Sequence, residues 1–159
     1  MVASHVIAQQ DIATRVKDWT QDLCIALSEN YRNYHMRMLN RNLNDPTYGY
    51  KSYAQEQLDE IKNGTAKLMQ FKILEGKKYY KIVQMEWRDA NDYLERKAGY
   101  TYGSVNAFVD KKTGEVYKPA SWKAPHTKHV RYDMRIMSQR QFLHNPDNVD
   151  WAGGYLYMR

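Results

Sequence analysis

The sequence predicts an α+β fold in which a long N-terminal helix packs on an antiparallel sheet of four or five strands. Residues 1–63 carry an apolar repeat of helical period, residues 64–159 carry alternating apolar and polar residues, and glycine-containing turns separate the alternating runs. A length of 159 residues suits one core. We therefore expect a single domain, with a helical part over 1–63 and a mostly β part over 64–159.

The first helix is predicted from apolar positions that recur every three or four residues. Residues 4–43 contain no proline and no glycine. Such spacing places apolar side chains on one face of a helix, which then needs an apolar partner. The positions are Ile12, Val16, Trp19, Leu23, Leu27, Tyr31, Tyr34 and Met38. One long helix and two helices broken near residues 28–30 both fit, and we expect Trp19 to be buried against the sheet.

A second helix is predicted over residues 53–63, because Asn63-Gly64 is a frequent signal at helix C-termini. Two alternating runs follow, residues 67–74 and 78–87, separated by Glu75-Gly76-Lys77. A short glycine-containing turn between alternating runs predicts a β-hairpin.

A second hairpin pairs residues 104–110 with residues 115–118. The turn between them ends in Gly114, which can adopt the positive φ of a type I turn with a bulge. Residues 88–97, between the two hairpins, fit either a short helix or a long loop.

Shorter elements are predicted toward the C-terminus. They are a loop over residues 119–125, a strand over 129–134, a short helix over 138–143, a turn at 145–147 and a terminal strand over 154–158. A terminal run of strand composition is expected to pair into the sheet.

Composition limits the setting of the protein. The single cysteine, Cys24, rules out an internal disulfide, and we expect a buried structural thiol. The N-terminus lacks the pattern of a secretory signal, and no apolar run approaches the ~20 residues that span a bilayer. These features predict a cytoplasmic protein with no membrane contact.

No residue pattern points to catalysis, a metal or a cofactor, and we expect none of the three. His126 and His129 could ligate a metal if Asp133 joined them, but no cysteine or acidic cluster accompanies them. The pairs Asp89 with Asp92 and Asp147 with Asp150 lack the flanking residues of a hydrolase or nuclease motif.

The net charge of +6 is concentrated near the C-terminus, where residues 101–140 hold eight basic and three acidic side chains. Proteins that bind single strands combine cations for phosphates with aromatic faces for bases. The predicted phosphate contacts are Lys111, Lys112, Lys118, Lys123, Lys128, Arg131 and Arg135, and the stacking candidates are Trp122 and Tyr132. The alternative is that the aromatics form core and cross-strand pairs, with exposed lysines providing solubility.

The segment Ser104 to Pro125, with His129-Val-Arg-Tyr132 and the terminal Gly-Gly-Tyr-Leu-Tyr, resembles small uncharacterised proteins of tailed bacteriophages, including marine phages. The most specific part is Val-Tyr-Lys-Pro-Ala-Ser-Trp-Lys-Ala-Pro. The resemblance covers about the last third of the chain. It implies a viral origin and a place in the host cytoplasm or the virion, and it carries over no functional residue.

Two functions from different classes follow as hypotheses. The first is a non-enzymatic phage protein that binds nucleic acid through its basic, aromatic-rich C-terminal segment. The second is a virion structural or host-interaction protein whose basic side contacts an acidic protein surface. The sequence leaves open DNA or RNA, single or double strand, and the oligomeric state.

Overall fold

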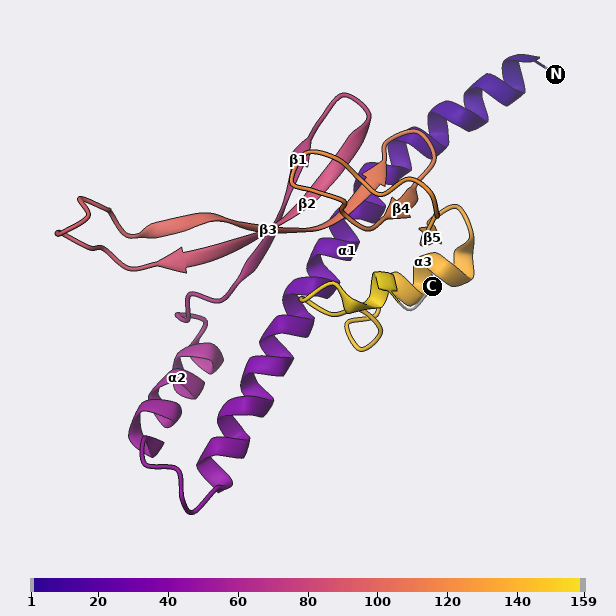
Figure 1. The fold of residues 1–159 in the computed structure, drawn as a ribbon. Helices are drawn as coiled ribbons and strands as arrows, with labels where there is room; N and C mark the ends of the chain where they lie inside the picture. Colours follow the sequence, from indigo (N-terminus) through magenta and orange to yellow (C-terminus); the bar gives the residue numbers. More distant parts are fainter. Residues whose placement is uncertain (1, 158–159) are drawn as a thin grey trace.

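The protein has an α+β fold, described here from a computed structural model that covers residues 2–157, with side chains from Asp11 to Tyr157. In chain order the elements are α1 (Val2–Asn44), α2 (Lys51–Asn63), β1 (Gln70–Glu75), β2 (Tyr79–Arg88), β3 (Gly99–Asp110), β4 (Glu115–Tyr117), β5 (Tyr132–Asp133), α3 (Met137–Leu143) and the 3₁₀ helix η1 (Gly154–Tyr157). The five strands form one antiparallel sheet in sequence order, and α1 crosses one of its faces (Figure 1). The predicted fold class is confirmed.

α1 is one continuous helix of 43 residues, so the alternative of a break near residues 28–30 is wrong. Asn30 does not disturb the helix, because its side chain bonds to groups outside it. Its amide donates to the Pro146 carbonyl at 2.9 Å and accepts the Trp151 N–H at 3.0 Å. No helix in the described part of the chain combines the length and apolar character needed to cross a membrane.

A main cluster of buried residues lies between the middle of α1, the inner face of the sheet, α3 and the C-terminal segment. Inward-facing residues alternate along β2 and β3, as expected for a sheet with a helix on that face. The cluster consists of Val16, Leu23, Cys24, Ala26, Leu27, Tyr80, Ile82, Ala107, Val109, Val116, Tyr132, Met134, Leu143, Val149, Tyr155 and Leu156. Each fully buried aliphatic side chain here contributes about 1.5–3 kcal/mol.

A second buried cluster lies between the C-terminal third of α1 and α2, and we call it the hairpin cluster because these two helices form a helical hairpin. Leu39 packs with Ala54, Leu58 and Ile61, all at most 4% exposed. α2 ends at the predicted signal, where Gly64 has a left-handed φ of 77° and donates its N–H to the Ile61 carbonyl.

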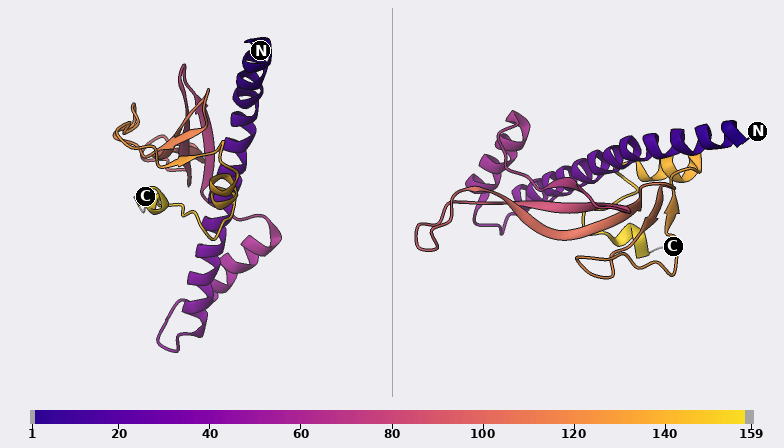
Figure 2. Two further views of the ribbon diagram at one scale, coloured as in Figure 1. Left: turned by 90° about the vertical axis from the view of Figure 1, so that its right-hand side faces the viewer. Right: turned by 90° about the horizontal axis from the view of Figure 1, so that it is seen from above.

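The long β2–β3 hairpin projects beyond the rest of the sheet (Figures 1 and 2). We call its outer part, residues 86–101, the arm. Its tip is closed by a bridge between Asn91 and Arg96, so residues 88–97 are the end of a hairpin rather than a helix. At the base, the rings of Trp87 and Tyr100 pack edge to face at 5.2 Å.

The hairpin between β3 and β4 is confirmed, with Gly114 at a φ of 75°. The strand predicted over 129–134 is wrong in extent, because only residues 132–133 pair with β4. The helix predicted over 138–143 is confirmed as α3.

The terminal strand predicted over 154–158 is wrong for residues 154–157, which form η1, while Met158 lies outside the described residues. The carboxylate of Asp150 accepts the N–H groups of Gly154 and Tyr155 at 2.9 and 2.7 Å, which starts the helical turn. Tyr155 and Leu156 are nevertheless buried in the main cluster. The apolar side chains reach the core without a strand.

Side chains of the sheet hold this C-terminal segment in place of backbone pairing. The buried amides of Gln84 and Asn106 both donate to the Trp151 carbonyl, at 2.7 and 3.1 Å. The Tyr155 hydroxyl lies 2.6 Å from the Asn106 side-chain oxygen. Buried polar groups are thereby satisfied, as stability requires.

The prediction that Trp19 is buried against the sheet is wrong. It is half-buried, and the Arg140 guanidinium of α3 lies 4.5 Å from its ring centroid. His144, just after α3, contacts the Trp19 carbonyl at 3.0 Å. Trp19 therefore faces α3, while Leu23 and Leu27 face the sheet.

Cys24 is buried as predicted, at 8% exposure. Burial raises the pKa of its thiol to about 12. The thiol therefore stays protonated at neutral pH, which suits a structural role and not a nucleophile.

Candidate nucleic-acid interface

The outer face of the sheet, opposite α1, carries a group of aromatic rings. Tyr80 and Ile82 point toward α1, so their neighbours Tyr79 and Lys81 point outward. The Tyr79 ring meets Phe108 and Tyr117 edge to face, at centroid distances of 6.0 and 6.2 Å. These contacts hold the Tyr79 ring in one orientation on the outer face.

A loop after β4, residues 118–131, closes on itself over this face, and we call it the covering loop. A bridge between Pro119 and Pro125 narrows it, and the Ala120 N–H donates to the Ala124 carbonyl at 3.0 Å. Trp122 lies in the turn between these two prolines and packs against Tyr102 of β3, with ring centroids 6.0 Å apart. Trp122 and Tyr102 remain 41% and 55% exposed, so both rings are accessible from solvent.

Lys81 connects the two aromatic groups. Its ammonium lies 4.4 Å from the Trp122 ring centroid and 5.8 Å from that of Phe108. A cation over an aromatic face is favourable and keeps the lysine extended along the surface. The charge of Lys81 therefore lies between the Phe108 ring and the Trp122–Tyr102 pair.

A hollow of about 320 Å³ opens between the β1–β2 turn and the covering loop. We call it the lysine hollow; it is lined by Leu74, Glu75, Gly76, Lys77, Lys78, Tyr79, Lys81, Phe108 and Lys123. The four lysines form no ion pair within the described part of the chain. Their charges are available to an anion.

Glu75 is the only carboxylate in this lining, and it is neutralised by Lys111. The Lys111 ammonium lies 2.9 Å from the Glu75 carboxylate and 3.1 Å from the Gly76 carbonyl. Hydrogen bonding and the charge of Lys111 lower the pKa of Glu75, so the pair persists at neutral pH. Glu75 lies opposite Tyr80, and the Lys111 ammonium is 5.5 Å from the Tyr80 ring centroid, so Lys111, predicted as a phosphate contact, instead pairs with Glu75 on the α1 side of the sheet.

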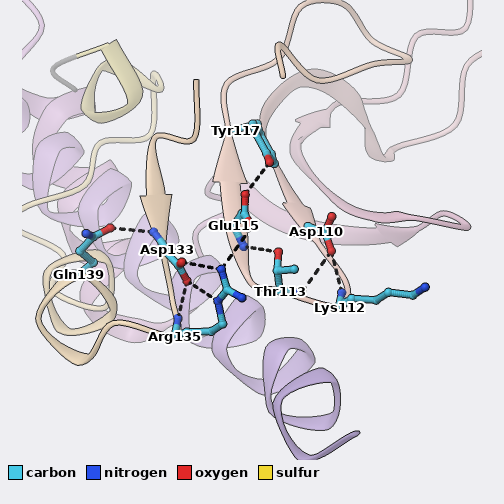
Figure 3. Close-up of polar contacts among 8 residues, drawn as sticks. All are labelled: Asp110, Lys112, Thr113, Glu115, Tyr117, Asp133, Arg135 and Gln139. Carbon is cyan, nitrogen blue, oxygen red and sulfur yellow. Dashed lines mark hydrogen bonds and ion pairs between the residues drawn. The ribbon is translucent and has the colours of Figure 1, made fainter. Parts of the chain in front are cut away.

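Arg135 is held in an ion-pair network on the β4–β5 side of the sheet (Figure 3). Its guanidinium lies 2.8 Å from the Asp133 carboxylate and 3.3 Å from that of Glu115. Desolvation raises the pKa of Asp133, but the bonds from Arg135 outweigh it and the net shift is downward. The prediction of Arg135 as a phosphate contact does not fit this arrangement, because its charge is already neutralised.

Tyr132 cannot offer a ring face to a base in this structure. Its side chain is 3% exposed, with its hydroxyl donating to the Tyr155 carbonyl at 2.9 Å. The ring stacks between those of Phe142 and Tyr155. We therefore leave Tyr132 out of the candidate interface.

The remaining predicted cations lie outside the lysine hollow. Lys112 is exposed at the β3–β4 turn, where its N–H bonds to the Asp110 carboxylate. The Lys118 ammonium lies 4.5 Å from the Tyr157 ring centroid. Lys128 is exposed on the covering loop, and Arg131 is half-buried at its end. Of the predicted residues, only Lys123, which lines the lysine hollow, and Trp122, which contacts Lys81, belong to the candidate interface.

The neighbouring histidines do not form a metal centre with Asp133. The rings of His126 and His129 stack at 6.4 Å, while Asp133 is bound by Arg135. Burial, followed by the charges of Lys118 and Arg131, lowers the pKa of His126. Among the described residues, no group of three or more His, Cys, Asp or Glu side chains is placed to hold a metal ion.

One member of each candidate carboxylate pair has a local structural partner. The Trp87 indole donates to Asp89 at 2.9 Å. Asp150 accepts the N–H groups that begin η1. These contacts give both carboxylates a role in the fold.

Sequence reasoning missed the lysines of the β1–β2 turn and β2. It followed the charge excess over residues 101–140, whereas the run Lys77-Lys78-Tyr79-Tyr80-Lys81 lies earlier in the chain. That run combines basic and aromatic residues at strand spacing, which was the available signal. The structure brings it beside Trp122 and Lys123.

Comparison with known proteins yields one family. The model of a family of unknown function, DUF7717, matches residues 3–158, which includes the helical half as well as the last third. No curated protein and no solved structure matches the chain.

Proposed function

The chain belongs to DUF7717, a family of unknown function, and we propose that it is a non-enzymatic protein that binds nucleic acid on the outer face of its sheet. The observation that carries the proposal is the lysine hollow, where four lysines that form no ion pair with any described residue lie beside the rings of Tyr79 and Phe108. Phosphates supply the negative charge that these lysines need, and bases supply flat faces for the rings.

The charge of the whole chain supports the same partner. A net charge of +6 draws polyanions to the protein over distances near the Debye length, about 8 Å at physiological salt. Ion pairs neutralise part of the positive charge in residues 101–140, namely that of Lys111 and Arg135. The proposed contact surface therefore shifts from the whole basic segment to Lys77, Lys78, Lys81, Trp122 and Lys123.

The biological setting is part of the proposal. The resemblance of residues 104–125 to proteins of tailed bacteriophages supports a viral origin. A phage protein of this kind would act on nucleic acid in the host cytoplasm or inside the virion.

The test is the salt dependence of binding to a short labelled oligonucleotide. Each phosphate contact releases counterions, so log affinity against log salt has a slope of about 0.7 per contact for a single strand. The triple change Lys78→Ala, Lys81→Ala and Lys123→Ala should flatten that slope by about two units. Lys51→Ala with Lys62→Ala, two exposed lysines of α2, is the matched control.

Equal slopes for the triple variant and the parent would place binding elsewhere on the surface. A parent that binds no oligonucleotide at low salt would contradict the function itself. Circular dichroism and melting temperature of each variant check for misfolding. Lys78 and Lys123 are exposed and contribute little to stability, whereas Lys81 is half-buried and contacts the Trp122 and Phe108 rings.

The arm favours a second candidate, a virion or host protein-interaction role. Tyr93 and Leu94 at its tip are 94% and 60% exposed, although they are large apolar side chains. The turn that presents them is ordered by hydrogen bonds: the Leu94 N–H donates to the Asn91 side chain at 3.1 Å and the Arg96 guanidinium to the Asp89 carbonyl. Preordered aromatic anchors are typical of protein interfaces.

A photoreactive amino acid tests this candidate. Placed at position 93 in cells that express the protein, it should give one discrete crosslinked adduct. The same amino acid at position 50, where Tyr50 is 72% exposed, is the control. Identical adducts at both positions would indicate random encounter and contradict a specific role for the arm.

A further inference from the structure

We infer that the lysine hollow seats one unpaired nucleotide, so that the ligand of the outer face is a single strand and not a duplex. This inference rests on the proposed function and names its substrate class. It draws on the size of the hollow, the rings of its lining, the positions of its cations and the second ring pair beyond Lys81.

The size of the hollow limits what can enter it. Its volume of about 320 Å³ lies at the lower end of the range for small-molecule sites, about 300–1,000 Å³. A group of nucleotide dimensions suits this space, whereas a double helix does not. A base that stays paired keeps its faces inside the stack, so only an unpaired base can present a face to the lining.

The rings of the lining are built to contact a base. Tyr79 is half-buried, with part of its side chain exposed, while Phe108 below it is 2% exposed. The edge-to-face contacts with Phe108 and Tyr117 fix the Tyr79 ring before any ligand arrives. Such preorganisation reduces the entropy lost on binding.

The cations lie where the phosphates of a strand would run. Lys77 and Lys78 come from the β1–β2 turn on one side, and Lys123 comes from the covering loop on the other. Glu75 also borders the hollow, but its carboxylate is paired with Lys111 beside Tyr80 on the α1 side, so it does not oppose an anion in the hollow.

The Trp122–Tyr102 ring pair sets the path of the nucleic-acid strand across the sheet. Lys81 lies between the hollow and Trp122, with its ammonium within 6 Å of both the Phe108 and Trp122 rings. A base in the hollow and the next base against Tyr102 and Trp122 would place the linking phosphate near Lys81. The geometry assigns two adjacent nucleotides to these two subsites.

The experiment compares a labelled single strand with the blunt duplex of the same sequence at one salt concentration, by fluorescence anisotropy. We expect the strand to bind more tightly. Tyr79→Leu, which keeps apolar bulk but removes the ring, should weaken strand binding about 5- to 150-fold and leave the salt slope unchanged. Tyr50→Leu, a change at an exposed tyrosine in the α1–α2 loop, is the control.

The outcomes separate this inference from the proposed function. Equal or tighter binding of the duplex, or an unchanged affinity of Tyr79→Leu for the strand, overturns the nucleotide-sized subsite and leaves nucleic-acid binding intact. Absence of binding to either oligonucleotide overturns both.

Discussion

The middle of α1 and its C-terminal third bury their apolar residues against different partners. Leu23 and Leu27 pack under the sheet in the main cluster, whereas Leu39 packs against α2 in the hairpin cluster. α1 spans about 65 Å at 1.5 Å per residue, and the longest strand, β3, spans about 40 Å at 3.3 Å per residue. A helix longer than its sheet needs a second partner to cover its apolar face, and α2 provides it.

Trp151 covers α1 between the two clusters. Its ring meets Tyr31 edge to face at 5.4 Å and Tyr34 at 5.6 Å. The two clusters differ in support, because the main cluster is enclosed by a sheet, two helices and the C-terminal segment, while the hairpin cluster has two helices and the short segments on either side of α2. We therefore expect them to differ in local stability.

The largest effect should come from Leu27→Ala in the main cluster. Leu27 is 0% exposed, so the change leaves a cavity and should lower the free energy of unfolding by about 3–5 kcal/mol. Urea denaturation followed by circular dichroism measures it. Ile25→Ala, two residues away at 63% exposure, should change stability by about 0.5 kcal/mol or less. Similar losses for both variants would show that this face of α1 is not packed as described.

Leu58→Ala in the hairpin cluster should cost about 2–3 kcal/mol, because fewer elements surround the site. Its effect should be local. Hydrogen exchange should show faster exchange in α2 and the C-terminal third of α1, with β2 and β3 unchanged. Loss of protection across the sheet would mean that the two clusters unfold as one unit and would remove the distinction between them.

Gly64→Ala should destabilise the end of α2 by about 1 kcal/mol. A Cβ at this position meets no atom within 4 Å, so the effect comes from the left-handed φ of 77° alone. Gly49→Ala is the matched control, because its Cβ also has open space and its φ is not in that region. A melting temperature that falls equally for both variants would contradict the role of the Gly64 cap.

The smallest effect should be a loss of stability on mild acidification. Burial lowers the pKa of His144 and of His35 below 6.5, so below about pH 6.5 the unfolded chain binds protons more readily than the folded one. Stability should therefore fall from about pH 6.5 toward pH 5, above the range in which carboxylates titrate. His144→Gln and His35→Gln should each make this loss of stability smaller, because each removes a group whose pKa is lowered by burial. A melting temperature that stays constant over this range in the parent would contradict the prediction.

The candidate site shows how far the charge pattern alone can lead. Trp122 and Lys123 could be named from sequence, because a basic and aromatic segment is visible there. Lys77 and Lys78 of the β1–β2 turn and Lys81 of β2 were missed, because their proximity to the covering loop depends on how the turn and the loop meet in the folded chain. The roles of Arg135 and Tyr132 changed because ion pairing and burial are decided by contacts between distant segments.

The sequence by itself determined the local elements of this protein. The apolar repeat of α1, the Gly64 stop and the Gly76 and Gly114 turns depend on residues within a few positions of one another, where helical period and backbone freedom decide the conformation. Only the tertiary structure decided the form of the C-terminus. Residues 154–157 have strand composition, but the N–H groups bound by Asp150 and the Trp151 carbonyl bound by Gln84 and Asn106 replace sheet pairing. Hydrogen bonds from the nearby Asp150 and from the distant Gln84 and Asn106 together outweigh a weak local preference for strand.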